Sequence, residues 1–398
     1  MKIEYREIEG RSGGYWLLVA ALGAVTAAGL AGAWTMEHHG HIVTGMTNQV
    51  VWGIPHVVAV FLIVAASGAL NVASIASVFG KDFYKPLAPL SGLHAIALLA
   101  GGLAVLALDL GRADRIMVAM TRYNFTSIFA LNIFLYTGFF AIVAVYLWTM
   151  MERRMNRYAT PVGYAAFVWR LVLTTGTGSI FGFLVARQAY DSAMLAPTFI
   201  AMSFSYGLAV YLLTLIAAYA WSGRELDEAV LRRLKNLLIV LVAAVLYFVT
   251  VFHLTNLYFA KQTAFERFVL LDGGVYPALF WGGEILLGSI LPMAMLAHPR
   301  LGAARGVVVA ASILVVVGGL AQMYVTIIGG QAFPLELFPG FAQTSSFFDG
   351  RVHPYVPSLP EIALGAGGVA IAGIIVVIAV RALGFLPERL DARLAESP

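Results

Sequence analysis

The sequence is dominated by long apolar stretches, each long enough to cross a lipid bilayer as one helix. A membrane-crossing helix needs roughly 20 mostly apolar residues, and the sequence contains about ten such stretches. The alternating pattern of membrane β-barrel strands, about 10 residues each, is not present in the sequence. The sequence therefore predicts an all-α, polytopic integral membrane protein, with a single domain over residues 1–398. The predicted spans lie near residues 15–35, 50–79, 87–108, 126–150, 161–186, 197–219, 235–257, 275–297, 304–329 and 361–383.

Composition supports a lipid environment and excludes several classes of function. The chain is 60% hydrophobic and 12% charged, whereas soluble domains are about 45–50% apolar and about 25% charged. The net charge of +4 comes without a Lys/Arg block that would grip phosphates, so nucleic acid is not an expected partner. The chain has no cysteine, which excludes an iron–sulfur cluster held by its own thiolates. Any electron carrier must be a quinone, a haem or a cluster in a partner.

The distribution of basic residues predicts the orientation of the chain. Ten spans place both termini on one side of the membrane. Of the 25 Lys and Arg residues, seventeen fall on the terminal face, seven on the opposite face, and Arg170 lies inside a span. Because basic loops stay on the cytoplasmic side, both termini are predicted to be cytoplasmic.

The opposite, outer face carries the features that suggest function. It contains the His38–His39–Gly40–His41 cluster and the segment after Asp109. It also contains a loop over residues 330–360 that is rich in proline and aromatic residues. A loop of about 30 residues is unusual in a compact bundle. Two interpretations stay open, namely a docking surface for a partner and a re-entrant packing loop.

Several polar residues in or beside the spans are predicted to meet near the outer face. Ionisable groups within a bilayer are costly, by about 2.5–3.5 kcal/mol on insertion scales, and usually face the bundle interior. His56 lies one or two turns into the second span, and Asp109 ends the third. Trp52 precedes His56 by four residues, which would place both on one helical face. The candidate residues at this face are Trp52, His56, Asp109, Arg112, Tyr123 and Asn124.

These residue types suit the chemistry of a quinone head group. Quinol oxidation releases two protons, and a histidine is a suitable base because its reference pKa is near neutral. Asp109 could orient the imidazole of His56 or take the second proton, and Arg112 could instead neutralise Asp109. Each residue alone could equally be a packing or capping group.

A second set of polar residues lies deeper in the membrane or toward its cytoplasmic half. Such a set could form a proton path, but interhelical hydrogen bonds explain it as well. Its members are Asn71, His94, Arg170 and Glu284.

Two stretches resemble a known family. TNQVVWGIPHVVAVFLIVAASGALNVAS (residues 47–74) and LDLGRADRIMVAMTRYNFTS (residues 108–127) are similar to the NrfD/polysulfide reductase membrane-subunit (PsrC-like) family. The likeness covers most of the chain. Within the family it is greatest to the ten-helix branch typified by DsrP of the Dsr (DsrMKJOP) complex of sulfur metabolism, with HybB-like subunits as near neighbours.

The resemblance implies a function and a set of partners. It implies helices arranged in NrfD-like four-helix bundles, no redox centre in the chain itself, and a menaquinone or ubiquinone bound near the outer face. Electrons would pass to or from a periplasmic ferredoxin-like iron–sulfur subunit. His56 matches the family histidine that meets the quinone, whereas Trp52 stands where relatives can carry another polar residue. Further membrane and cytochrome subunits of a Dsr-like complex, in the bacterial cytoplasmic (inner) membrane, are implied.

Three alternatives remain open from the sequence. A haem b cytochrome needs two histidines at matched depth on facing helices, and only His56 and His253 form a plausible pair. A secondary transporter would show matched broken helices in its two halves, of which Gly176 and Gly178 give a weak hint. A structural membrane anchor would tolerate replacement of His56 and Asp109. The direction of electron flow is not determined.

Overall fold

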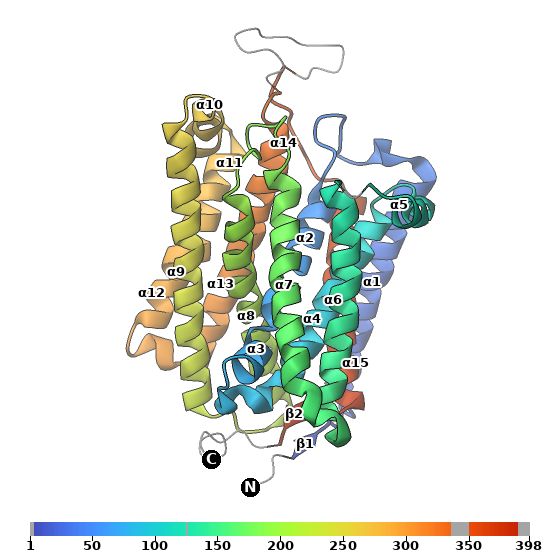
Figure 1. The fold of residues 1–398 in the computed structure, drawn as a ribbon, viewed down its shortest axis with the longest axis vertical. Helices are drawn as coiled ribbons and strands as arrows, with labels where there is room; N and C mark the ends of the chain where they lie inside the picture. The colour runs from blue at the N-terminus through green and yellow to red at the C-terminus, as the bar shows by residue number, and fades with distance from the viewer. Residues whose placement is uncertain (1–3, 125, 336–349, 389–398) are drawn as a thin grey trace.

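The protein is a bundle of long helices that run along one common direction (Figure 1). The computed structural model describes residues 4–388 except Phe125 and residues 336–349. Its helices, with η5, η6 and η8 π-helical and the other η segments 3₁₀, are α1 (Gly13–His39), η1 (His41–Val43), α2 (Ile54–Ala69), α3 (Asn71–Ser77), η2 (Asp82–Leu87), α4 (Ala88–Leu108), η3 (Ala113–Arg115), α5 (Ile116–Thr121), α6 (Ile128–Met151), η4 (Arg153–Tyr158), α7 (Ala159–Gly182), α8 (Leu195–Ser222), α9 (Glu228–Tyr258), α10 (Thr263–Arg267), η5 (Phe268–Asp272), α11 (Val275–Pro277), η6 (Ala278–Ile290), α12 (Leu291–Ala297), η7 (Leu301–Ala303), α13 (Arg305–Tyr324), η8 (Val325–Gly329), α14 (Gly330–Ala332) and α15 (Leu359–Ala382). Its strands are β1 (Tyr5–Arg6) and β2 (Leu386–Pro387).

The prediction of an all-helical, polytopic membrane protein is confirmed. Within residues 4–388, apart from the segments left undescribed, nine helices are long and apolar enough to cross a bilayer. The predicted span over residues 161–186 falls outside this group. It corresponds to α7, which has the required length but carries Arg170 and a T-T-G-T-G-S run that lower its hydropathy.

The two ends of the described chain lie together. β1 and β2 pair antiparallel, with Tyr5 opposite Pro387 and Arg6 opposite Leu386. Both strands therefore lie at one end of the bundle, at the bottom of Figure 1. A chain that begins and ends at the same end must cross the bundle an even number of times, so α7 is needed as a crossing segment. We call the opposite end, which carries α5, α10 and α14, the outer end.

The helices form two groups of four. The first contains α2, α4, α6 and α7, and the second contains α8, α9, the η6–α12 segment and α13. α1 packs with α15, which also packs against α4. The groups meet where α2 crosses α8, and a Cβ on Gly68 would lie 1.6 Å from the carbonyl oxygen of Ser203. Small residues let membrane helices approach this closely.

The predicted second span, residues 50–79, differs from the observed helices in two ways. α2 begins only at Ile54, with Pro55 in its first turn, where the missing N–H of proline costs no helical hydrogen bond. The helix then breaks at Leu70, and α3 starts at Asn71. Trp52 therefore precedes α2, so the prediction that Trp52 and His56 share one helical face is wrong.

Candidate functional site

A histidine and a buried carboxylate meet at the outer end of the first helix group. His56 lies in the first turn of α2, and Asp109 is the C-cap of α4. The Nδ1 atom of His56 lies 2.7 Å from Oδ2 of Asp109, and the Asp109 side chain is fully buried while that of His56 is 15% exposed. The structure thus brings together the two residues to which the sequence assigned a base and its partner.

A third side chain, His41, extends this pair toward the outer surface. Its Nε2 lies 3.2 Å from the backbone oxygen of Asp109 and 4.0 Å from Oδ1 of the same residue. The His41 side chain is 36% exposed. The outer histidine cluster was recognised in the sequence, but His41 was not among the residues predicted to form the site. Its predicted depth, at the same face as Asp109, was the signal that could have identified it.

A cavity of about 380 Å³ lies beside His56. Ligand pockets typically measure about 300–1,000 Å³, so this cavity has the size of a ring-containing ligand. Leu110 and Phe129 line it and are about half exposed, so the cavity reaches the outside of the bundle near the ends of α4 and α6. The walls are mostly apolar: Trp52, His56, Val60, Ile63, Leu103, Leu106, Ala107, Leu110, Ile116, Phe129, Asn132, Ile133, Tyr136, Thr137, Ile180, Phe181 and Ile327.

Asn132 supplies a second polar atom at this cavity. Its amide nitrogen donates to the carbonyl oxygens of Ile128, at 2.8 Å, and Gly176, at 3.1 Å. These bonds fix the amide, while its Oδ1 is buried and has no hydrogen-bond partner among the described atoms. A buried acceptor without a partner is costly, so Oδ1 is suited to accept a hydrogen bond from a ligand. Asn132 was not among the residues predicted from the sequence to form the site.

Two buried side chains hold the segment that leads into α2. The Oε1 atom of Gln331 accepts from the backbone nitrogens of Val51 and Trp52, at 2.9 and 3.0 Å, and its Nε2 donates to the Trp52 oxygen at 3.0 Å. The Tyr355 hydroxyl accepts from the Ile54 nitrogen and donates to Glu361, both at 2.7 Å. Burial, and then the bond to Glu361, raise the pKa of Tyr355, so the hydroxyl remains a donor.

This support positions the Trp52 ring over His56. The two rings stack with their centroids 6.0 Å apart and an interplanar angle of 27°. The Trp52 ring also packs at a tilt against Phe129 and edge to face against Phe181. The imidazole therefore has a fixed carboxylate on one side and an aromatic wall on another, although Trp52 is outside the helix.

Three residues predicted at the site lie elsewhere. Arg112 binds Asp114 through two contacts of 2.9 Å at the surface, so the predicted pair between Arg112 and Asp109 is wrong. Gly111 has a φ of +67° and turns the chain away after Asp109. Tyr123 packs on Phe134, with centroids 4.6 Å apart. Asn124 accepts hydrogen bonds from Thr126 just before α6. Arg112, Tyr123 and Asn124 do not line the cavity.

The deeper polar residues do not form one continuous set in the structure. Arg170 donates to the Asn71 oxygen at 2.9 Å and to the Ser67 carbonyl oxygen at 3.2 Å. These bonds join α7 to α2 and α3, which fits the interpretation as interhelical hydrogen bonding. The Nδ1 of His94 contacts the Leu90 oxygen within its own helix, at 2.8 Å. Glu284 lies in the second helix group.

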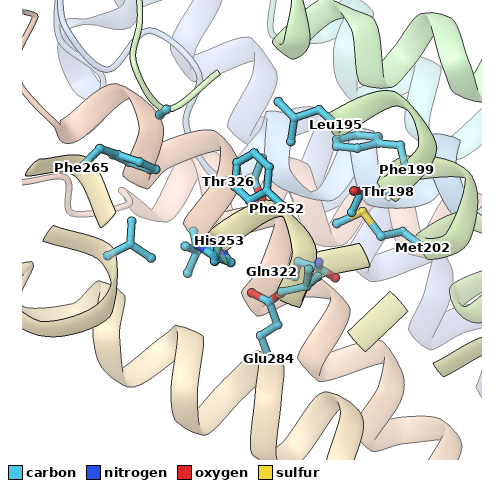
Figure 2. Close-up of a pocket in the computed structure, with 14 residues that line it drawn as sticks. Leu195, Thr198, Phe199, Met202, Phe252, His253, Phe265, Glu284, Gln322 and Thr326 are labelled. Carbon is cyan, nitrogen blue, oxygen red and sulfur yellow. The ribbon is translucent and has the colours of Figure 1, made fainter. Parts of the chain in front are cut away.

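A second, smaller cavity lies in the second helix group and is lined by His253 and Glu284 (Figure 2). The Nδ1 of His253 lies 2.6 Å from Oε2 of Glu266. His56 and His253 thus line different cavities, and each is held by its own carboxylate. The two imidazoles do not share a space in which one haem iron could bind, so the geometry does not support the predicted haem pair.

Fold and site together define an integral membrane protein of many helices with a ring-sized, mainly apolar cavity at its outer end. Residues 42–335 match the protein-family model described as "Polysulphide reductase, NrfD". The chain belongs to the NrfD family, as its resemblance predicted.

Named relatives show the range of proteins to which the chain is similar. It is 31% identical to an "Hdr-like menaquinol oxidoreductase integral membrane subunit" of Archaeoglobus fulgidus, over the whole of both proteins. It is 29% identical to a putative dimethyl sulfoxide reductase membrane subunit of Halobacterium salinarum, covering 97% of this chain and 94% of that one. It is 25% identical to one of the chains of polysulfide reductase from Wolinella succinogenes, covering 72% and 96%. These relatives support the family and not specifically the DsrP branch.

Proposed function

We propose that the protein is the quinone-reactive membrane subunit of a multi-subunit oxidoreductase complex. One observation carries this proposal: a cavity of about 380 Å³ places His56, backed by the fully buried Asp109, against an apolar, ring-sized space. The site combines apolar walls for the ring, polar atoms for the oxygens and an opening to the outside of the bundle for the tail. The A. fulgidus relative is named for menaquinol, which favours menaquinol over ubiquinol as the substrate.

His56 and the Oδ1 of Asn132 bind the two oxygens at opposite ends of the head group. One quinol hydroxyl donates to His56, and the other donates to the Oδ1 of Asn132. His56 is the general base and a catalytic residue, because it receives the first proton directly. Asp109 is a positioning residue that orients the imidazole and balances the positive charge that His56 acquires. Oxidation of one quinol releases two electrons and two protons and leaves the quinone.

The protons leave His56 toward the outer end, where His41 lies at the surface beyond Asp109. The Asp109 carboxyl group lies between the imidazole at the cavity and the imidazole at the surface. The proton that His56 receives can thus reach water without crossing the apolar interior. The second proton follows the same way when the remaining hydroxyl is turned toward His56, which is by then neutral again. Quinone reduction would use the same residues in the reverse order.

The electrons leave to an iron–sulfur cluster of a ferredoxin-like partner at the outer end, on the periplasmic side. Because the chain has no cysteine, an iron–sulfur cluster that accepts the electrons would lie in a partner. The outer end also carries part of the predicted docking loop, whose residues 336–349 lie outside the described residues. The basic-residue count supports cytoplasmic termini, and a Dsr-like complex of sulfur metabolism in the cytoplasmic membrane stays part of this proposal.

The test compares quinol oxidation by the purified complex with and without the base. His56→Ala should lower quinol-analogue oxidation about 10²–10⁴-fold, the usual contribution of a general base, while all subunits of the complex are retained. His39→Ala is the matched control, because His39 is exposed, its Nδ1 contacts the backbone oxygen of Thr35 at 3.1 Å, and it does not line the cavity.

Either of two results would contradict the proposal. Undiminished turnover of His56→Ala would reduce this chain to a structural anchor or move the site elsewhere. An optical spectrum with a haem Soret band that belongs to this subunit would revive the cytochrome alternative.

A further inference from the structure

The second cavity is too small for a quinone but large enough for water. Its volume is about 40 Å³, against about 380 Å³ for the cavity at His56. One water molecule needs roughly 10–15 Å³ by this measure, so the cavity accommodates about three. The two cavities must therefore hold different ligands.

Polar groups line this small cavity from several helices. Figure 2 shows Glu284 extending toward Gln322, with His253 nearby and Thr198 and Thr326 on the surrounding helices. Empty cavities in proteins are apolar, whereas buried waters typically make two to four hydrogen bonds to polar groups. The lining thus favours a hydrated cavity.

Close packing of two helices places Glu284 opposite Gln322. Gly288 and Gly318 approach so closely that a Cβ on Gly318 would lie 2.1 Å from the Gly288 Cα. Glu284 lies in the π-helical segment η6, and another π-helical segment, η8, follows α13. Such segments often mark functional sites. The Gln322 oxygen accepts a hydrogen bond from Tyr206, which leaves the Gln322 amide nitrogen available to the cavity.

The charge of Glu284 has no lysine or arginine partner in this cavity. The side chain is buried, and its carboxyl group makes no hydrogen bond or ion pair with any residue that the structure describes. The cavity lining contains no lysine or arginine. A membrane-embedded carboxylate requires compensation, and only a proton on Glu284, on His253 or on the water between them can supply it here.

His253 connects the cavity to the outer end. Its Nδ1 binds the fully buried Glu266, and the Asn256 amide donates to the other oxygen of Glu266 at 2.8 Å. The His253 side chain is 14% exposed. This arrangement repeats that of His56 and Asp109, in which the histidine also lines a cavity and its Nδ1 meets a buried carboxylate.

The two cavities share a wall. Ile327 lines the larger cavity, and the preceding residues Val325 and Thr326 line the smaller one, all within η8. Phe181 of the larger cavity also packs against Phe199 of the smaller, with ring centroids 5.6 Å apart. Side chains that line the two cavities are therefore in direct packing contact with one another.

From these observations we infer that the second cavity is a proton-binding site distinct from the quinone site. Glu284 and a few waters hold the proton, and the His253–Glu266 pair exchanges it with the outer end. The inference deepens the proposed function and rests on it, because it adds a proton site next to a quinol-oxidising one. The site itself requires only water and a proton as ligands.

Infrared spectroscopy of the purified whole complex tests the site without relying on turnover. A protonated buried carboxyl group gives a C=O stretching band above the amide region, and transfer to D₂O shifts that band when water reaches it. We expect such a band in the wild type, its loss in Glu284→Gln and its displacement in Glu284→Asp. Glu228→Gln, which removes an acid from the first turn of α9 at the opposite end, should leave it unchanged.

The proton connection has its own readout. His253→Ala should slow the shift of the Glu284 band in D₂O at least several-fold. The inference is overturned if no band responds to Glu284→Gln, if the band persists unshifted in D₂O, or if His253→Ala exchanges at the wild-type rate. His56→Ala should lower quinol oxidation about 10²–10⁴-fold and leave the band in place, so a failure of the proposed function remains distinguishable from a failure of this site.

Discussion

The carboxylate of Asp109 should accelerate quinol oxidation through its charge, and Asp109→Asn isolates that effect. Asparagine has nearly the same shape, so the contact with His56 and the packing are kept while the charge is removed. The pair is buried, with His56 15% exposed and Asp109 fully buried, so screening by water is limited. The quinol is neutral when it binds, and therefore the substitution should act on the proton-transfer step.

The magnitude follows from the geometry. The Nδ1–Oδ2 contact of 2.7 Å puts the two charge centres at about 4 Å, where unit charges attract by about 4 kcal/mol at an effective dielectric constant near 20. If His56 carries half a unit of charge in the transition state, about 2 kcal/mol is lost. A factor of ten in rate corresponds to about 1.4 kcal/mol, so kcat should fall roughly 30-fold, and at most about 10³-fold.

Steady-state oxidation of a quinol analogue by the purified complex measures this effect. We expect a lower kcat with a KM close to wild type, because only the transition state loses an interaction. Asp114→Asn is the matched control: it removes the same charge five residues away, from a carboxylate that is 63% exposed and bound to Arg112. A kcat for Asp109→Asn within twofold of wild type, or an equal loss in both variants, would refute the reasoning.

Two further variants test the proton exit and the support of the site. His41→Gln should lower kcat several-fold without changing KM, and added imidazole should restore the rate, whereas a variant insensitive to imidazole with wild-type turnover would remove His41 from the exit route. Gln331→Leu leaves the part-buried Val51 and Trp52 amides without their acceptor, at up to about 1–3 kcal/mol for each, so both the unfolding temperature in detergent and the affinity for quinol should fall. An unchanged unfolding temperature would show that water replaces the Gln331 side chain.

The positions of residues along the membrane normal could be read from the sequence. Each predicted apolar run overlaps a long helix, although α9 begins at Glu228, seven residues before its predicted run, and the second run is broken at Leu70. The overlap follows because a bilayer of fixed thickness requires about 20 residues per crossing. A helix rises 1.5 Å per residue, so the distance of His56 and Asp109 from their span ends placed both near the outer face. That shared depth made a contact between them possible without determining it.

The rotation of each helix about its axis could not be read in the same way. In water, the periodicity of apolar residues reveals the buried face; in a bilayer, lipid and the bundle interior are both apolar, so this signal is nearly lost. That is why Asn132 was not assigned to the site, and why His253 and His56 appeared to be a pair although they line separate cavities. Short-range backbone geometry was also hidden, since the positive φ of Gly111 directs Arg112 outward.

The sequence by itself determined that this protein spans a lipid bilayer, has no cysteine to hold an iron–sulfur cluster and carries titratable groups near one membrane surface. Only the tertiary structure decided which of those groups share a space. It brought together His56, Asp109 and His41 from three separate segments, and it placed Glu284 and His253 around a cavity of a different size. The physical reason is that spatial neighbours depend on helix rotation and close packing at small residues, and both emerge only when all the helices are packed together.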